Sequence, residues 1–335
     1  MMRNQPSRHA AVLALVCALT VSTFAGCTQP KTNIERPAPT VGFVQAIEDP
    51  TIGDARKGFE DALRKNGFSD SAGTVKIVYR NAQGDIPTLN QIIDQFVADK
   101  VSLIAANTTL AMMTAVQKTK DIPIFMMVAP SPDINKLTEL HAGGNQTAPK
   151  NLSGVYETLA YIDSTMSLTK QLFPNVKRIA IIYNSSEPNS MNSVTRLREQ
   201  CREKGIELIE QAITSSNEAQ QAADAVLSKS PDVFFALPDN VVFASFETIL
   251  KSATDKKIPI ITSEEGLVKR GAFAAYGADF YQWGFQAGES AAEYLRSGDL
   301  VSVPLQTVKV RKLTYNEATA TALGLTPPAG AMAVK

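Results

Sequence analysis

Histidine and cysteine, which many catalytic and metal sites use, are scarce in this chain of 335 residues. It contains two histidines, His9 and His141, and three cysteines. His9 lies in an N-terminal leader and His141 stands in a loop beside two glycines, so a Ser-His-Asp triad has no suitable base. The short signals Gly-x-Gly-x-x-Gly, the Walker loop, His-Glu-x-x-His and Gly-x-Ser-x-Gly are absent. We therefore expect no enzyme, no metal site and no cofactor.

An excess of charge of one sign is also lacking. Lys and Arg together number 33, and Asp and Glu together also number 33. The charges are interspersed along predicted helices, which is typical of solvated faces. Because the chain has no overall basic excess to attract phosphates, we expect no nucleic-acid partner.

The apolar run over 10–21 is too short to span a bilayer. Arg3 and Arg8 precede it, and this order of charge and apolar residues is typical of a secretory signal. Phe24-Ala25-Gly26-Cys27 then resembles a bacterial lipobox, whose cysteine is lipidated and becomes the new N-terminus. We predict a signal peptide over 1–26 and a membrane anchor at Cys27. The protein would be exported and would face the periplasm or the cell exterior; inner and outer membranes both stay open.

Residues 27–40 carry three prolines and almost no apolar residue, which indicates an extended tether. Cys17 leaves with the signal and Cys27 is acylated, so Cys201 remains alone. We expect Cys201 to be buried on a helix as a small apolar residue.

From Val41 onward, short apolar runs alternate with amphipathic stretches, which predicts an α/β protein. The predicted strands are 41–45, 75–79, 102–106 and 122–128 in the first half, and 179–183, 207–213, 232–237 and 258–262 in the second. The predicted helices are 52–66, 86–99 and 110–118, followed by 190–204, 217–228 and 241–254. Ser190 or Asn192 would cap the helix over 190–204, and Gly205 would end it. The same order in both halves, with Ile-Pro-Ile at 122–124 and 258–260, predicts two similar Rossmann-like βαβ lobes with parallel sheets.

Beyond Ile261 the pattern changes to a strand over 271–276, a helix over 280–295 and a strand over 303–310. These elements would return the chain to the first lobe and would form a hinge with a cleft between the lobes. We predict one lobe from 41–157 plus about 275–300, and the other from 158–274 plus about 301–325.

Polar residues recur where the predicted strands end. They are Gln45, Glu48, Asn107, Thr108, Thr109, Pro130 and Ser131 in the first half, and Asn184–Ser190, Pro238, Asp239, Asn240, Ser263, Glu264 and Glu265 in the second. Ligands of parallel sheets bind at this edge, where hydroxyls and helix N-termini suit a carboxylate. Asp239 or a glutamate suits an ammonium group, so a zwitterionic amino acid would satisfy both ends.

Each of these residues has a structural alternative. Thr108, Thr109 and Asp239 could cap helices, and Glu264 could be an exposed acid of a first helical turn. Four aromatic residues near strand ends could stack on an apolar ligand or pack in the core; they are Tyr156, Tyr183, Phe243 and Tyr276.

Several motifs together resemble the tryptophan/tyrosine-type substrate-binding proteins of bacterial ABC transporters. They are Val41-Gly-Phe-Val-Gln45 with Asp49-Pro50, Tyr79-Arg-Asn-Ala-Gln-Gly-Asp85, Leu89-Asn-Gln91, Phe96-Val-Ala-Asp-Lys100, Tyr183-Asn-Ser-Ser-Glu-Pro-Asn-Ser190, Pro238-Asp-Asn240, Glu265-Gly266 and Arg270-Gly-Ala272. The resemblance covers the whole mature chain. It implies a type I periplasmic-binding-protein fold, in which two lobes joined by three crossings capture a small ligand for a membrane permease.

The resemblance also implies ligand-binding residues. Ser186, Glu187, Asn189 and Ser190 match the ligand loop of the family, and Asp239 and Asn240 match its Asp-Asn pair. Two segments on the first-lobe side depart from the family pattern, at 106–111 and 128–133. An aromatic amino acid is therefore the ligand expected from the family, and a different ligand is the alternative.

The sequence thus predicts a lipid-anchored, monomeric solute-binding protein. Its predicted partners are a small ligand of the amino-acid class, an ABC permease and the membrane. The predicted binding residues are Gln45, Thr108, Thr109, Ser131, Ser186, Glu187, Asn189, Ser190, Asp239, Asn240 and Glu265. A receptor module of a membrane sensor would use the same fold and ligand. An envelope enzyme with carboxylate chemistry is the third possibility.

Overall fold

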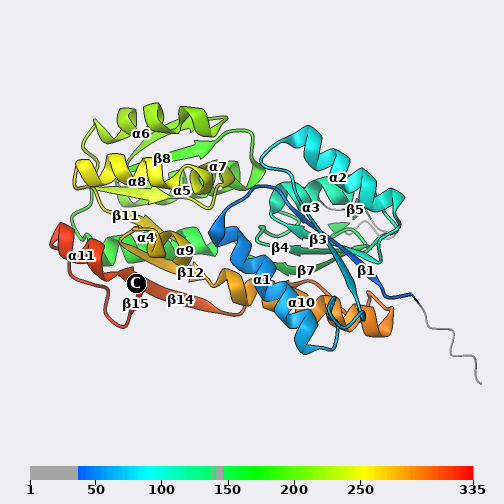
Figure 1. The fold of residues 1–335 in the computed structure, drawn as a ribbon. Coiled ribbons are helices and arrows are strands. Elements are labelled where there is room, and N and C mark those ends of the chain that lie inside the picture. The colour runs from blue at the N-terminus through cyan, green and yellow to red at the C-terminus, as the bar shows by residue number, and fades with distance from the viewer. Residues whose placement is uncertain (1–36, 138, 141–145, 335) are drawn as a thin grey trace, which may run out of the picture. The chain divides into compact units, whose positions relative to one another are not determined.

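A computed structural model describes residues 37–137, 139–140 and 146–334 (Figure 1). The predicted signal peptide over 1–26, Cys27, His141 and most of the tether lie outside the described residues. No helix in the described part is long and apolar enough to cross a membrane.

The first lobe is built on a six-stranded sheet whose strand pairs are all parallel. Its order is β13 (Gln306–Thr307), β7 (Leu152–Tyr156), β4 (Ile124–Met127), β3 (Leu103–Asn107), β1 (Thr40–Gln45) and β2 (Lys76–Asn81). Its helices are α1 (Pro50–Lys65), α2 (Ile86–Ala98), α3 (Thr109–Lys118) and α10 (Phe280–Ser297). Alternation along β1 buries both faces, because Phe43 packs in the cluster with α1 and α10 whereas Val44 packs with α2 and α3.

The second lobe is built on a seven-stranded sheet. Its order is β15 (Met332–Val334), β14 (Arg311–Asn316), β12 (Ala274–Ala278), β11 (Ile260–Thr262), β10 (Val233–Ala236), β8 (Arg178–Asn184) and β9 (Glu207–Ile213). Only the pair of β12 and β14 is antiparallel among the strand pairs described in this sheet. Its helices are α4 (Ala160–Leu172), α5 (Pro188–Lys204), α6 (Ala219–Leu227), α7 (Asn240–Ala244), α8 (Phe246–Asp255), α9 (Glu265–Lys269) and α11 (Glu317–Leu323), with a 3-10 turn over Ser216–Glu218. A separate antiparallel pair joins β5 (Glu139–Leu140) to β6 (Gln146–Thr147).

The two lobes repeat one topology, as the sequence predicts. The order β2-β1-β3-β4-β7 in the first sheet corresponds to β9-β8-β10-β11-β12 in the second. In both sheets the first strand of the lobe lies inside the sheet. The second strand pairs on one side of it, and the later strands are added in turn on its other side. The predicted α/β class with two similar parallel-sheet lobes is therefore confirmed.

The chain passes between the two sheets three times: between β7 and α4, between β12 and α10, and between β13 and β14. The predicted boundaries of the returning segment need correction. The strand expected at 271–276 is β12 and belongs to the second sheet, so the return begins at about Asp279 rather than at 275. The strand expected at 303–310 contains only β13, in the first sheet, and β14 begins after it at Arg311, in the second sheet. The segment predicted for the second lobe at about 301–325 therefore begins in the first lobe.

Two further details concern α5 and its cysteine. The helix begins at Pro188, with Glu187 at the N-cap, so Ser190 and Asn192 lie within its first turns and do not cap it as predicted. Proline is favoured at this first position because its φ is already helical. Gly205 ends the helix in a left-handed conformation, φ 66°, and Cys201 is buried and free, both as predicted.

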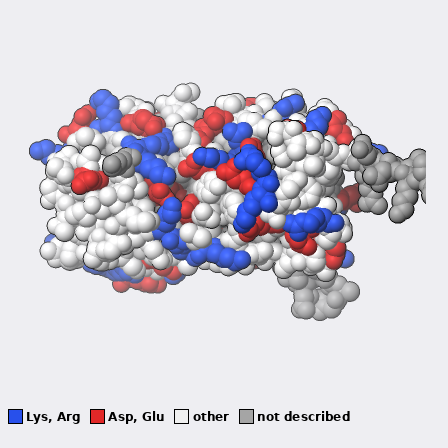
Figure 2. Space-filling model, turned by 60° about the horizontal axis from the view of Figure 1, so that its bottom comes forward, with Lys and Arg blue, Asp and Glu red and all other residues white. Residues whose placement is uncertain are grey.

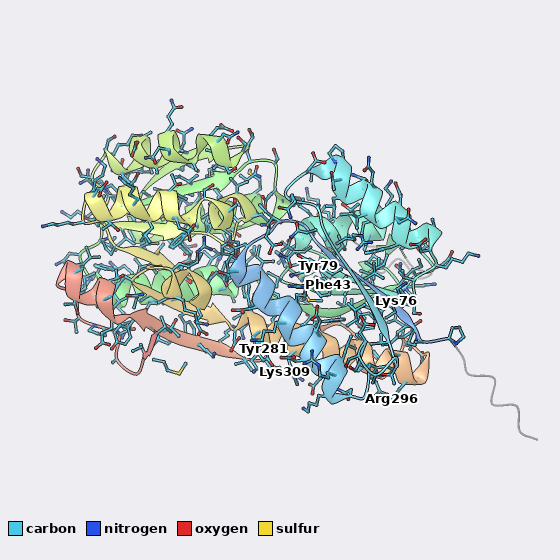
Figure 3. The ribbon with its side chains drawn as sticks, viewed as in Figure 1. Phe43, Lys76, Tyr79, Tyr281, Arg296 and Lys309 are labelled. Carbon is cyan, nitrogen blue, oxygen red and sulfur yellow. The ribbon has the colours of Figure 1, made fainter. Side chains whose placement is uncertain are left out.

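Helices α1 and α10 lie against each other on one side of the first sheet (Figures 1 and 3). Their contact requires glycine, since a Cβ atom at Gly284 would stand 1.8 Å from the carbonyl oxygen of Ala55. Tyr281, labelled in Figure 3, donates from its hydroxyl to Asp61 at 3.0 Å across the same contact. Behind α1, Phe43 and Tyr79 lie side by side with ring centroids 6.1 Å apart. This packing fixes the first turn of α10, which contributes to the site described below.

Charged side chains of both signs are mixed on the molecular face shown in Figure 2. Many are paired at the surface; Lys251 and Asp255, one turn apart on α8, approach to 3.0 Å. Such exposed pairs contribute little to stability, about 0.3–0.5 kcal/mol each.

Candidate functional site

A cavity lies between the lobes, beside the carboxyl ends of several strands. It has a volume of about 540 Å³ including the part that is open to solvent. Its lining residues are Thr108, Thr109, Val128, Ala129, Pro130, Glu157, Tyr161, Asn189, Pro238, Asn240, Phe243, Ser263, Glu264, Ala278, Phe280 and Trp283. The lining residues come from both lobes and from two of the crossings, so a ligand in this cavity would contact both lobes.

One part of the cavity wall is aromatic. Phe280 and Trp283 lie one turn apart at the start of α10, and their ring centroids are 5.7 Å apart at 90°. Phe243 from α7 meets Phe280 edge to face, with centroids 6.2 Å apart at 81°. The indole nitrogen of Trp283 donates to the carbonyl oxygen of Val155 at 2.8 Å, which fixes the ring. Such a preformed wall suits a flat apolar group.

Three polar atoms of lining residues are buried and have no hydrogen-bond partner within the described ranges. They are Oγ1 of Thr108, Oδ1 of Asn189 and Oε2 of Glu264. Thr108 belongs to the first lobe, whereas Asn189 and Glu264 belong to the second. An unsatisfied buried polar group costs about 1–3 kcal/mol, so three such groups around one cavity indicate that a ligand completes them.

Glu264 is the most perturbed acid of the cavity wall. Its pKa is raised to about 8, mainly by burial and also by the nearby carboxylate of Glu157, against a hydrogen bond from Ser263 that lowers it. The Ser263 hydroxyl donates to Oε1 at 2.6 Å, which leaves Oε2 for a ligand. Glu157 is held by Arg311 at 2.6 Å. A cationic ligand group beside Glu264 would favour its ionised form.

The backbone is strained at two lining residues of the first lobe. Thr108, after β3, has φ 152°, and Val128, after β4, has φ 51°. β-Branched residues rarely adopt positive φ, and such strain clusters at functional sites. Both residues lie in the segments that depart from the family pattern.

Helix α3 begins at Thr109 beside the cavity, with Thr108 at its N-cap. The Thr108 side chain makes no capping hydrogen bond, so the helix-cap alternative does not explain its hydroxyl. The first N–H groups of a helix have no partner within the helix and favour an anion.

Four of the predicted binding residues line this cavity: Thr108, Thr109, Asn189 and Asn240. Asp239 does not. Its carboxylate is fully buried and accepts from the backbone N–H of Asn184 at 2.6 Å, the Ser190 hydroxyl at 2.5 Å and the backbone N–H of Val242 at 2.9 Å. Asp239 therefore caps α7 and ties it to the loop after β8, and Ser190 serves the same contact.

The other predicted residues also lie elsewhere. The side chain of Gln45 donates to the carbonyl oxygen of Ile47 at 2.8 Å, and the backbone N–H of Ser131 donates to the carbonyl oxygen of Glu157 at 3.0 Å. Ser186 and Glu187 line a second cavity. Glu265 lines a third and pairs with Lys269 and Lys312.

Among the lining residues that sequence reasoning missed are Glu157, Tyr161, Phe280 and Trp283. Glu157 directly follows β7, so the strand-end rule could have included it. Phe280 and Trp283 stand on a helix that was correctly predicted, but periodicity alone gives no means to tell a core face from a cavity wall.

The lobes also touch beside the cavity. Arg270, after α9, pairs with Asp49 at 2.7 Å, and Asp49 caps α1 through the backbone N–H of Thr51 at 2.8 Å. Gly266 packs on Thr51 so closely that a Cβ atom would stand 2.3 Å from the Thr51 side chain. These contacts hold α9 of the second lobe against α1 of the first.

No group of three or more His, Cys, Asp or Glu residues able to hold a metal ion occurs in the part of the chain that the structure describes.

Two parallel-sheet lobes, three crossings and a cavity between them define a type I periplasmic binding protein. The family described as ABC transporter substrate binding protein matches residues 40–332. The chain therefore belongs to this family.

Three relatives illustrate the similarity. A tyrosine-binding protein of Clostridioides difficile (strain R20291) is 36% identical over 326 residues, which cover 94% of this chain and 92% of the relative. A Streptococcus pneumoniae ABC domain in complex with L-Trp has 26% identity and a TM-score of 0.78, covering 89% of this chain and 100% of that chain. A Clostridium difficile substrate-binding protein with adhesive properties, in its ligand-free, open structure, has 33% identity but a TM-score of 0.65, covering 89% and 99%. By TM-score, the structure of this chain is thus more similar to the tryptophan complex than to the open structure, although its sequence identity with the open structure is higher.

Proposed function

We propose that the protein binds an amino acid with an aromatic side chain in the cavity between its lobes and delivers it to an ABC permease, without a chemical step of its own. The observation that carries this proposal is the combination of an aromatic wall with three unpartnered polar atoms from both lobes. The tyrosine-binding relative and the tryptophan complex support the ligand class.

Each part of such a ligand has a counterpart in the cavity. The ammonium group would donate to Oε2 of Glu264 and Oδ1 of Asn189, which are both acceptors. The carboxylate would accept from the Thr108 hydroxyl and from the N–H groups at the start of α3. The side chain would lie against the aromatic wall. A charge-assisted hydrogen bond contributes about 1.5–3 kcal/mol, so a few of them suffice for micromolar affinity after the cost of ordering.

Ligand binding and lobe closure would be coupled. Because the unpartnered atoms belong to both lobes, one ligand can satisfy all three only when the lobes are close together. The ligand would therefore shift the population toward the closed state, which a permease can distinguish from the open state. We further propose that Cys27 carries the lipid anchor, which would keep the protein outside the cytoplasm next to its permease.

The test is isothermal titration calorimetry on the chain from Thr28 onward, unfolded and refolded to remove any carried-over ligand. L-tyrosine and L-tryptophan are titrated first, followed by aliphatic amino acids, sugars and nucleobases. We expect saturable binding of at least one aromatic amino acid at micromolar concentration or below. Binding of another class alone would show that the segments 106–111 and 128–133 have changed the ligand, and would overturn the proposal.

A further inference from the structure

Glu187 does not line the cavity between the lobes, although it is itself one of the predicted residues of the ligand loop. It is 2% exposed and stands at the N-cap of α5. Three asparagines surround its carboxylate: Asn184, Asn189 and Asn240. A buried acid whose partners are all neutral amides is costly, and this cost calls for an explanation.

Both carboxylate oxygens of Glu187 are already in use. The amide nitrogen of Asn184 donates to Oε1 at 2.9 Å. Oε2 accepts from the side-chain nitrogen of Asn189 at 3.3 Å, from the side-chain nitrogen of Asn240 at 2.8 Å and from the backbone N–H of Asn240 at 3.3 Å. Glu187 is therefore better placed to orient these side chains than to contact a ligand.

The orientation of Asn189 follows from its neighbours. Its amide nitrogen lies near two acceptors, Oε2 of Glu187 at 3.3 Å and the carbonyl oxygen of Pro238 at 3.1 Å. Flipping the amide would place its oxygen against both of them, so only one orientation is favourable. The atom left over is Oδ1, which is the unpartnered acceptor of Asn189 at the cavity.

The same argument applies to Asn240, which lines both this cavity and the second one, on the side of Glu187. Its side-chain nitrogen points to Glu187, so its oxygen is turned away from the carboxylate. One buried acid thus fixes two amides, and each presents an acceptor rather than a donor on its other side.

We propose that Glu187 is a positioning residue for ligand specificity: it holds the amides of Asn189 and Asn240 with their oxygens turned away from it, the Asn189 oxygen being unpartnered among the described residues, and so selects ligands that carry an amine at this point. This inference rests on the proposed function and adds the residue that enforces amine recognition.

One charged group adjoins this network. The pKa of Glu187 is raised to about 7, mainly by burial and also by the neighbouring carboxylate of Asp239, against the hydrogen bonds from the asparagines, which lower it. Asp239 is occupied by its own three donors, so it offers Glu187 no hydrogen bond among the contacts described.

The test uses matched ligand pairs with and without the amine: L-tyrosine against 3-(4-hydroxyphenyl)propanoate, and L-tryptophan against indole-3-propanoate. In Glu187→Gln, the new side-chain amide must face one of the asparagine amides, which favours a flip that turns a donor toward the cavity. We expect Glu187→Gln to weaken binding of the amino acid at least tenfold and binding of the amine-free analogue less than twofold. The control Glu265→Gln, whose carboxylate lies at another cavity, should change neither.

A combined variant separates positioning from direct contact. Because Glu187 acts through Asn189 and Asn240, adding Glu187→Gln to a variant that carries both Asn189→Ala and Asn240→Ala should weaken amino-acid binding further by less than threefold. Fully multiplicative losses, or equal loss of both members of a ligand pair, would overturn the inference. If Glu187→Gln does not fold, Asn189→Ala alone serves as the test, because this variant must show the same amine-selective loss.

The same measurements separate this inference from the proposed function. If the wild-type protein binds no member of either ligand pair, the proposed function itself fails. If the wild-type protein binds the amino acids and the variants keep its selectivity for the amine, only this inference fails.

Discussion

Glu264 should make ligand affinity depend on pH. Because the pKa of this buried carboxyl is raised to about 8, the ligand-free protein holds it mainly protonated at pH 7. An ammonium group at Oε2 favours the ionised form, so ligand binding should release a proton. Affinity should therefore rise as the pH rises toward 8 and level off above it.

The size of the effect follows from the fraction ionised. With a pKa of about 8, roughly 1% of Glu264 is ionised at pH 6, roughly 9% at pH 7 and roughly 50% at pH 8. If only the ionised form binds the ligand, affinity rises about tenfold from pH 6 to 7 and about fivefold from pH 7 to 8. Glu187, whose pKa is raised to about 7, can add less than about twofold in the second interval.

The assay is calorimetric titration with an aromatic amino acid at pH 7 and pH 8, in buffers of different ionisation enthalpy so that proton release is counted. Wild type and the neighbouring control Glu265→Gln should show the fivefold gain and the released proton. Glu264→Gln should bind about ten to a hundred times more weakly, from the loss of one charge-assisted bond, and should gain less than twofold. An equal gain in Glu264→Gln, or no pH dependence in wild type, would refute the assignment of Glu264 to the ammonium.

The remaining predictions concern packing and the anchor. Gly284→Ala places a methyl group 1.8 Å from the carbonyl oxygen of Ala55, so α1 and α10 must separate, and chemical denaturation should show a loss of about 2–4 kcal/mol. Gly53→Ala in α1 meets nothing within 4 Å and should stabilise by about 0.5–1 kcal/mol; a similar loss in both variants would contradict the packing argument. Cys27→Ser should move the protein from the membrane fraction to the soluble extracytoplasmic fraction, and unchanged membrane association would argue against lipidation at this cysteine.

The fold could be predicted because the same alternation of strands and helices occurs in both halves of the sequence. Buried strands such as β8 are short apolar runs between amphipathic helices, and the same order recurs in both halves. The change of sheet between β13 and β14 could not be predicted in the same way. The sheet to which a strand belongs depends on the strand beside it. The sequence of a short apolar run does not show whether the run will pair with β7, as β13 does, or with β12, as β14 does.

The sequence predicts which edge of the sheets carries the site, but not which side chains at that edge face the cavity. The strand-end rule correctly brought Thr108, Asn189 and Asn240 to one edge, because the carboxyl ends of parallel strands lie together. It leaves two roles open for Asp239, an ammonium contact or a helix cap, because both occupy the same sequence position relative to a strand; the structure shows the cap. Side-chain direction decides between them, and that direction is set by packing with segments distant in sequence.

The features that make the cavity suitable for a ligand also lower the stability of the ligand-free protein. The raised pKa of Glu264 means that the folded protein binds a proton which the unfolded chain releases above pH 4.5, so stability falls as the pH rises from 4.5 through 8. At pH 7 this amounts to roughly 3 kcal/mol, and the positive φ of Thr108 and Val128 adds of the order of 1–3 kcal/mol each. Selection for stability alone would remove these costs, for example by Glu264→Gln. Their concentration around one cavity is therefore the strongest physical reason to regard it as the binding site, and a ligand that satisfies atoms of both lobes would offset them only by closing the lobes.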